Sequence, residues 1–511
     1  MRRWLGPLCL SAALAAAPVV LAPSNPALAD KASNTIRFAY DQIPENIDPY
    51  FNNLRAGVII SQHVWDTLIY RDPVSGQYKG QLATAWRYLD DKTLELDLRT
   101  GVKFHDGTEF TAEDVVFTLT YASRPENKAT TQANVSWIDR VEAVTPQKVR
   151  IHTKQPFPAA IDYLSGPLVI HPAKYYEKVG PKGMNEKPIG SGPFRVASHV
   201  VGKSLTLERN PDYFKDSPKP SAKIAKLEIR FIPDRQTQMA EVMAGGLDFI
   251  MNVPKDQAEQ IGGVPGFQAR SGETMRIAFL NINTLPDGPV EAFRDVRVRR
   301  ALNHAINKDA LTKELVGGGS RPLVTPCFPE QFGCTSEGAT RYPYDPAKAK
   351  ALLKEAGFGN GLSIDFYAYR ERQQAEAIIN DLRAVGITAN LRFLQYAAMR
   401  DQGRANKVGL AFQTWGSNSV NDVSASTPVY FGGGADDVSR DPEIHGFLRT
   451  GDTSVDPEAR KAAYKKALAL IAERAYSVPL YTVPNHYVAS AGLDFKVYPD
   501  ETPRFWEMTW K

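Results

Sequence analysis

Residues 362–393 read LSIDFYAYRERQQAEAIINDLRAVGITANLRF. Their pattern predicts a strand, then a helix at 371–385 with one apolar face, then a second alternating strand after Gly386. A strand–helix–strand unit implies parallel strands joined by a right-handed crossover. A further helix and a strand at 409–413 continue the pattern, so this region predicts an α/β fold.

Two polar clusters follow the ends of strands in this region. Tyr369-Arg370 comes directly after the first strand, and Trp415-Gly416-Ser417-Asn418 follows the strand at 409–413. In open α/β sheets, ligands bind in the crevice beyond the carboxyl ends of the strands. These two clusters are therefore candidate ligand contacts.

The rest of the chain combines alternating strands with helices that carry recognisable starts. Thr111 is followed three residues later by an acidic residue, which indicates a capping box. Aspartates that precede a helix, two of them with proline at the next position, indicate N-caps. The expected strands are at 93–98, 204–208 and 226–231, and the expected helices begin at Thr111, near 234, at Asp295 (running to Leu311), at Asp345 and at Asp456.

Length and composition exclude several classes of protein. The chain has 511 residues, of which 43% are hydrophobic and 23% charged, values that suit a globular protein of two to four domains. A small disulfide-stapled module, a multi-span membrane protein and a mainly disordered chain are excluded. The net charge of +4 gives no electrostatic reason to expect nucleic acid as a partner.

The N-terminus has the order of a secretory signal. Arg2 and Arg3 precede an apolar stretch, and Ala27-Leu28-Ala29 provides a small-residue cleavage site before Asp30. An uncleaved membrane anchor is the alternative, because the apolar stretch is nearly long enough to span a membrane. We expect residues 1–29 to be a cleaved signal peptide and the mature chain to be soluble and periplasmic.

The number and the spacing of the cysteines agree with export to an oxidising compartment. Cys327 and Cys334 are the only cysteines after residue 29, and they lie seven positions apart in a loop that contains proline and glycine. An oxidising compartment would let them pair. A zinc site is the alternative, but the eight histidines are scattered and none lies near the loop in sequence.

Catalytic motifs are missing or incomplete. Gly202-Lys203-Ser204 resembles the end of a phosphate-binding loop, but Ala197 stands where the first glycine is required and a strand follows. His105-Asp106-Gly107 is better explained as a tight turn than as a catalytic dyad. The sequence contains no H-E-x-x-H and no C-x-x-C. We therefore expect no enzyme activity, no metal site and no cofactor.

Five ordered motifs carry a family resemblance. The run LRTGVKFHDGTEFTAEDVVF at 98–117 resembles the signature of extracellular solute-binding proteins of the peptide/nickel class, family 5, which serve ABC importers. The other four motifs are GSGPF at 190–194, LERNPDYF at 207–214, FRDVRVRRAL at 293–302 and YDPAKAKALL at 344–353. They span essentially the whole mature chain, and they identify the scaffold better than the ligand.

The resemblance implies a periplasmic-binding-protein-like α/β fold with two lobes, a hinge and an inserted smaller α+β domain. The segments described above suggest its boundaries. Residues 30–71, 188–283 and 480–511 would form lobe I, residues 72–187 the inserted domain, and residues 284–479 lobe II. A ligand that contacts both lobes stabilises the closed state, and a permease can read that closure.

The resemblance also suggests ligand contacts. In peptide binders of this family, an aspartate three residues after a tryptophan holds the ligand's ammonium group; here Trp415 matches, but the third residue on is Asn418. An amide makes a weaker bond to an ammonium group than a carboxylate does. Asp422 either replaces that aspartate or is a turn or cap residue, which we favour. Ser417, Tyr369 and Arg370 join the candidate set, with Arg404 as a carboxylate clamp and Trp137 as an aromatic wall.

The sequence thus predicts a monomeric, non-enzymatic periplasmic receptor of an ABC importer. Its ligand is expected to be a peptide, a peptide-like compound or another small polar solute, and its partners are that ligand and the permease subunits. A metal-chelate or haem carrier on the same scaffold is the alternative, and a hydrolase is a more remote one.

Overall fold

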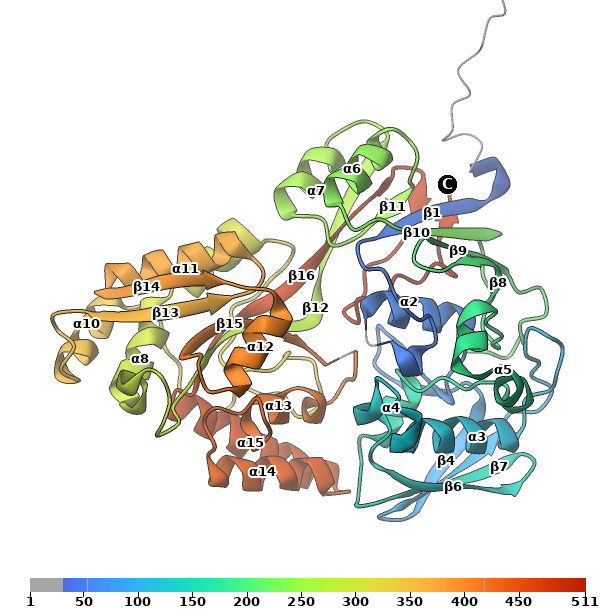
Figure 1. Ribbon diagram of the computed structural model, residues 1–511, viewed down its shortest axis with the longest axis horizontal. Coiled ribbons are helices and arrows are strands. Elements are labelled where there is room, and N and C mark those ends of the chain that lie inside the picture. The colour runs from blue at the N-terminus through green and yellow to red at the C-terminus, as the bar shows by residue number, and fades with distance from the viewer. Residues whose placement is uncertain (1–30, 53, 418) are drawn as a thin grey trace, which may run out of the picture.

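The computed structural model describes residues 31–52, 54–417 and 419–511, so the expected signal peptide and Asn418 lie outside the described residues. The chain forms two halves that lie side by side (Figure 1). The terminal half contains the elements from β1 to α7 and the segment that follows β16. The central half contains the elements from α8 to α15. Within the described residues, no helix is long and apolar enough to cross a membrane.

One ten-stranded sheet runs through both halves, in the order β14-β13-β15-β12-β16-β11-β1-β10-β9-β8. β1 is parallel to β10 and β11, and β13 is parallel to β14 and β15, whereas the other pairs are antiparallel. The strands are β1 (Thr35–Tyr40), β8 (Phe194–Val200), β9 (Ser204–Arg209), β10 (Lys226–Phe231), β11 (Phe249–Ile250), β12 (Phe267–Ile282), β13 (Leu362–Ala368), β14 (Ile387–Phe393), β15 (Leu410–Gly416) and β16 (Ser477–Ser490).

The two longest strands, β12 and β16, connect the halves. They pair with each other from Phe267↔Ser490 to Asn281↔Ser477. β16 pairs with β11 in the terminal half, and β12 pairs with β15 in the central half. The register shifts between Glu273 and Ile277, which lies midway along the pair. These strands cross from one half to the other in Figure 1, and a bulge at this position makes the pair easier to bend.

The terminal half contains a second sheet of four strands in the order β4-β5-β7-β6, which forms the lower end of the half in Figure 1. Its side chains and those of β1 and α2 belong to one continuous hydrophobic cluster. The elements here are β2 (Ile69–Arg71), β3 (Tyr78–Gly80), β4 (Ala83–Asp90), β5 (Thr93–Leu98), β6 (Ile138–Thr145), β7 (Lys148–Thr153), β17 (Leu493–Asp494), β18 (Thr509–Trp510), α2 (Arg55–Val64), α3 (Ala112–Ser123), α4 (Ala160–Ser165), α5 (Ala173–Glu186), α6 (Arg235–Met243), α7 (Lys255–Gly262), η1 (Pro49–Phe51), η2 (Pro125–Asn127) and η3 (Gln132–Asn134).

The central half contains the predicted strand–helix–strand unit. β13 pairs in parallel with β14 in the register Leu362↔Ile387, and α11 joins them, as the sequence predicts. The predicted caps Asp345 and Asp456 each accept a backbone N–H at the start of their helices. The elements are η4 (Glu291–Arg294), α8 (Val296–Ala305), α9 (Lys308–Ala310), η5 (Leu311–Val316), α10 (Pro346–Glu355), α11 (Arg372–Ala384), α12 (Tyr396–Arg404), η6 (Val423–Ala425), α13 (Thr427–Phe431), α14 (Pro442–Thr453) and α15 (Pro457–Glu473).

The prediction of one helix from Asp295 to Leu311 is wrong at the C-terminal end. Asp295 caps α8 as predicted, but α8 ends at Ala305. The side chain of Asn307 then accepts the N–H of Ala310 and begins α9, so a new cap interrupts the apolar stripe. In the loop that follows, a disulfide joins Cys327 to Cys334.

Candidate ligand-binding site

The carboxyl ends of β13 and β15 meet in the central half. The hydroxyl of Tyr369 lies 2.9 Å from Oγ1 of Thr414. The ring centroids of Tyr369 and Tyr396 are 5.0 Å apart. The ring of Trp415 packs edge-on against Tyr430, 5.6 Å away. The parallel register of β13 and β15 therefore brings Tyr369 and Trp415 to one end of the sheet.

The loop after β15 turns back on itself. Ser417 is buried, and its hydroxyl donates to the carbonyl of Val420 at 2.5 Å. Asp422 accepts the N–H of Ser424 and pairs with the buried Arg460 at 2.7 Å. The interpretation of Asp422 as a cap residue is therefore confirmed. Asn418, the residue that follows Ser417 along the chain, lies outside the described residues.

Arg55, at the first position of α2, connects the two halves. Its Nη1 donates to the hydroxyl of Ser419 at 2.8 Å, and Ser419 donates in turn to the carbonyl of Asp500 at 2.7 Å. Ser419 belongs to the central half, whereas Arg55 and Asp500 belong to the terminal half. Ser419 has a φ of 70°, in the left-handed region that few residues with a side chain adopt.

Glu501 extends this connection through charge. Its carboxylate lies 3.0 Å from Arg55 and 3.3 Å from Arg276 on β12. Burial opposes the ionisation of Glu501, but the two guanidinium charges outweigh burial and lower its pKa to about 2. Glu501 is therefore ionised at physiological pH, and it pairs with one cation from α2 and one from the connecting strand β12.

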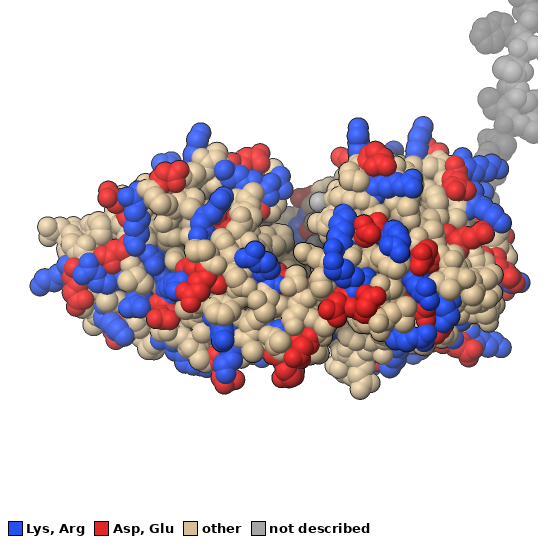
Figure 2. Space-filling model, turned by 90° about the horizontal axis from the view of Figure 1, so that it is seen from below, with Lys and Arg blue, Asp and Glu red and all other residues tan. Residues whose placement is uncertain are grey.

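A small hollow lies where Ser419 faces the terminal half. It offers about 50 Å³ to the centre of a water-sized molecule. Seen from below, the surface is recessed along the boundary between the halves (Figure 2). We call this hollow the junction cavity; its lining residues are Val58, Gln62, Tyr70, Arg71, Ser165, Gly166, Ser419, Asp500, Thr502, Arg504 and Trp506.

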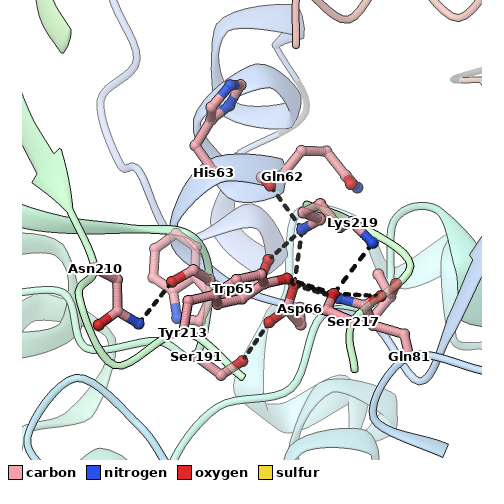
Figure 3. Close-up of polar contacts among 12 residues, drawn as sticks. Gln62, His63, Trp65, Asp66, Gln81, Ser191, Asn210, Tyr213, Ser217 and Lys219 are labelled. Atoms are coloured by element: carbon pink, nitrogen blue, oxygen red, sulfur yellow. Dashed lines mark hydrogen bonds and ion pairs between the residues drawn. The ribbon is translucent and has the colours of Figure 1, made fainter. Parts of the chain in front are cut away.

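A buried ion pair supports the wall of the junction cavity. Lys219 is 2% exposed, and its ammonium group donates to Asp66 at 2.8 Å and to the carbonyl of Gln62 at 2.8 Å (Figure 3). Its Nζ also lies 5.2 Å from the ring of Trp506. Burial lowers the pKa of Lys219, and the adjacent Asp66 counteracts this. The pair therefore fixes the C-terminal end of α2 and the indole that line the cavity.

A larger hollow lies beside the connecting strand β16. It has a volume of about 560 Å³ and is lined by residues of both halves, including Lys255, Arg370 and Tyr481. Arg370 pairs with Glu371 at 2.8 Å. Tyr481 is 2% exposed, and its hydroxyl has no hydrogen-bond partner within the described residues. Arg370 thus lies in the wall of a hollow that both halves line.

Asp162 links the four-stranded end of the terminal half to the central half. It accepts the hydroxyl of Tyr78 at 2.5 Å and the backbone N–H of Asn421. Burial raises the pKa of Asp162 to about 6, and the charge of Asp422 adds to this effect. The contact therefore joins the loop after β15 to α4.

Two sequence candidates lie elsewhere. Trp137 is 6% exposed, stacks on Phe157 at 4.9 Å and donates its N–H to the carbonyl of Asn134. Arg404 forms a half-exposed ion pair with Asp436 at 2.8 Å. Neither residue lines either hollow at the junction. Tyr369, Trp415 and Ser417 do not line one either, so Arg370, in the wall of the larger hollow, is the one sequence candidate within the described residues that does. Within residues 31–52, 54–417 and 419–511, no group of three or more His, Cys, Asp or Glu side chains is placed to hold a metal ion.

Sequence reasoning missed most of the junction. Arg55, Asp500, Arg504 and Trp506 come from a helix start and from the C-terminal segment, and none of them belongs to a recognisable motif. The only local signal was the position of Ser419, directly after the candidate cluster that ends at Asn418. The remaining residues become neighbours only when the chain folds.

Comparison with known proteins identifies the family of this chain. Residues 77–437 match the model of "Bacterial extracellular solute-binding proteins, family 5 Middle". Two similar proteins are the glutathione-binding protein GsiB of Salmonella choleraesuis, 26% identical over 94% of this chain and 92% of the relative, and that of Escherichia coli K12, 26% identical over 85% and 86%.

Solved structures share the fold. NikA from Brucella suis, in complex with Fe(III)-EDTA, has a TM-score of 0.81 and 24% identity over 93% of this chain and 100% of that chain. DppA from Helicobacter pylori, in complex with the peptide STSA, has a TM-score of 0.76 and 22% identity over 93% and 98%. The chain belongs to the bacterial extracellular solute-binding proteins of family 5, the periplasmic substrate-binding components of ABC importers.

Proposed function

We propose that the protein captures its solute between the two halves and presents the closed form to a membrane permease. The observation that carries this proposal is the hydrogen bond between Arg55 and Ser419, which joins the halves directly beside the junction cavity. The paired strands β12 and β16 act as the hinge. A solute that contacts both halves stabilises the closed state by its differential affinity for that state.

The proposed domain boundaries follow from this mechanism. Lobe I comprises residues 30–71, 188–283 and 480–511, residues 72–187 form the inserted domain, and lobe II comprises residues 284–479. The inserted domain shares a hydrophobic cluster with lobe I, so the two move together as one body. Closure is then a motion of lobe II against lobe I and the inserted domain.

The proposed solute is a peptide or a peptide-like compound. The support is the similarity of this chain to glutathione-binding proteins over nearly its full length. Tyr369, Arg370, Trp415, Ser417 and Asn418 are the proposed contacts from lobe II, because they follow the carboxyl ends of β13 and β15. No covalent chemistry is required of them, and the protein is proposed to be a binding protein and not an enzyme.

The proposed route begins with export. Residues 1–29 act as a signal peptide that is cleaved, and the mature protein works in the periplasm as a monomer. It does not act on nucleic acid, because the net charge of +4 provides no basic surface excess. A metal that travels on this scaffold would have to arrive with its own chelator, because the described residues offer no cluster of three ligands.

Native mass spectrometry of protein purified from a periplasmic extract tests the proposal. We expect a non-covalently bound solute whose mass is lost on denaturation. A thermal-shift screen of glutathione, dipeptides and tripeptides should then raise the melting temperature, because a ligand at 100 times its Kd stabilises by about 2.7 kcal/mol. Trp415→Ala should abolish the shift, whereas Trp86→Ala, in β4, should retain it. A protein that carries no solute and responds to none of these compounds contradicts the proposal.

A further inference from the structure

Three buried N–H donors meet at the junction cavity without a partner. They are Nε of Arg71, Nε of Arg504 and Nε1 of Trp506, and each lacks a hydrogen-bond acceptor within the described residues. Arg504 is 5% exposed and Trp506 is 1% exposed. Buried polar groups in proteins are nearly always paired, so three unpaired donors around one cavity indicate an acceptor from outside the chain.

The one carboxylate of the lining is already engaged, and Arg504 also interacts with the hydroxyl of Tyr70. The carboxylate of Asp500 is already used by two nitrogens of Arg504, at 2.5 and 3.1 Å, and by the N–H of Thr502 at 3.2 Å. Every buried side-chain atom without a partner among the lining residues is a donor. The cavity is therefore complementary to an acceptor and not to a donor such as an ammonium group.

The charges of the lining residues also favour an anion. The lining contains two guanidinium groups, Arg71 and Arg504, and one carboxylate, Asp500. Asp500 neutralises Arg504 through a paired contact, and no carboxylate of the lining pairs with Arg71, whose charge acts on Asp162 outside the lining. Guanidinium groups bind carboxylates and phosphates in fixed, often bidentate geometry. An anion would both pair the three donors and balance this charge.

The three side chains are held in place before any ligand arrives. Arg504 is fixed by Asp500 and by the ring of Tyr498, 4.1 Å from its guanidinium carbon. Trp506 packs under the ammonium group of Lys219. Donors that are already oriented lose little entropy when they bind. The cavity, at about 50 Å³, has room for one small functional group and not for a whole peptide.

We propose that the junction cavity is an anion subsite, in which Arg71, Arg504 and Trp506 bind a carboxylate or phosphate group of the transported solute. This inference rests on the proposed function and narrows it, because it requires the solute to carry a negatively charged end. The group reaches the cavity while the halves are apart and is enclosed when Ser419 meets Arg55.

Isothermal titration calorimetry on the full mature chain tests the subsite with three probes: succinate, inorganic phosphate and the uncharged succinamide. We expect one or both anions to bind and succinamide not to bind, and the stronger anion identifies the group. Arg71→Gln should weaken the binding of that anion at least tenfold. Trp506→Phe, which removes the indole N–H together with part of the ring, should weaken it severalfold. Arg140→Gln changes an exposed arginine of β6 and should have no effect.

Several results would contradict the proposal of an anion subsite. Binding of succinamide as tight as that of succinate, an unchanged affinity in Arg71→Gln, or no binding by either anion would each contradict it. The charge of the co-purified solute distinguishes failure of the anion subsite from failure of the proposed function. A neutral or cationic solute bound to the wild-type protein would keep the transport role and reject the anion subsite, whereas an anionic solute that is lost in Arg71→Gln supports both.

Discussion

Nη1 of Arg55 donates to the hydroxyl of Ser419 at 2.8 Å, although the two residues are 364 positions apart in the chain. The same arginine pairs with Glu501 at 3.0 Å. One side chain thus contacts the loop after β15, in the central half, and the C-terminal segment of its own half. Arg55 is therefore placed to couple closure of the halves to the conformation of both segments.

Arg55→Met is expected to destabilise the protein in a pH-dependent way. Glu501 titrates near 2 in the folded protein against 4.5 ordinarily, because Arg55 and Arg276 favour its charged form. A depressed pKa contributes stability above pH 4.5, and this contribution is lost as the pH falls toward 2. We expect the variant to lose about 2–3 kcal/mol at pH 7. Urea denaturation at pH 7 and pH 3 measures the difference, which should shrink at pH 3; an equal loss at both values contradicts the assignment.

Ser419→Ala is expected to weaken closure. The substitution removes the hydrogen bonds to Arg55 and to the carbonyl of Asp500, each with a net value of about 1 kcal/mol. Because the closed form binds the solute, affinity for the co-purified solute should fall up to about thirtyfold. Small-angle scattering should show a larger radius of gyration. Ser424→Ala is the matched control, since the Ser424 hydroxyl has no partner within the described residues. Similar losses in both variants would contradict a specific role for Ser419.

Lys219→Met is expected to be strongly destabilising. It leaves the fully buried carboxylate of Asp66 without its cation, and breaking a buried pair from one side costs about 3–5 kcal/mol. The double variant Asp66→Asn with Lys219→Met removes both charges and should recover part of this loss. Urea denaturation of the wild type, both single variants and the double variant gives the coupling energy. Simple additivity of the two losses would show that the pair is not coupled.

Asp162→Asn is expected to stabilise the protein at high pH. The pKa of Asp162 is raised to about 6 by burial, against 3.8 ordinarily, so the ionised form is disfavoured in the folded state. This penalty is absent below pH 4, grows as the pH rises toward 6 and is complete above it. The variant should gain about 1–3 kcal/mol at pH 8 and little at pH 4. Thermal unfolding across this range is the measurement, with the exposed Asp139→Asn as control. A gain that does not vary with pH contradicts the raised pKa.

Local chemistry made much of the fold predictable. The capping box at Thr111 and Asp114, the caps at Asp345 and Asp456, and the alternation in 362–393 each act within a few residues, so their effects are visible in the sequence. The break after Ala305 was missed because the cap at Asn307 competes with an apolar stripe that continues past it. Propensity and pattern alone do not say which of two such local signals prevails.

The sequence by itself determined the α/β class, the family scaffold and the strand ends that carry Tyr369 and Trp415. Only the tertiary structure decided the junction, because Arg55, Ser419 and Asp500 approach one another through the order of strands in a sheet that spans both halves. The same holds for the unpaired donors of Arg71, Arg504 and Trp506. Whether a polar side chain lacks a partner depends on every segment packed around it, and no local pattern contains that information.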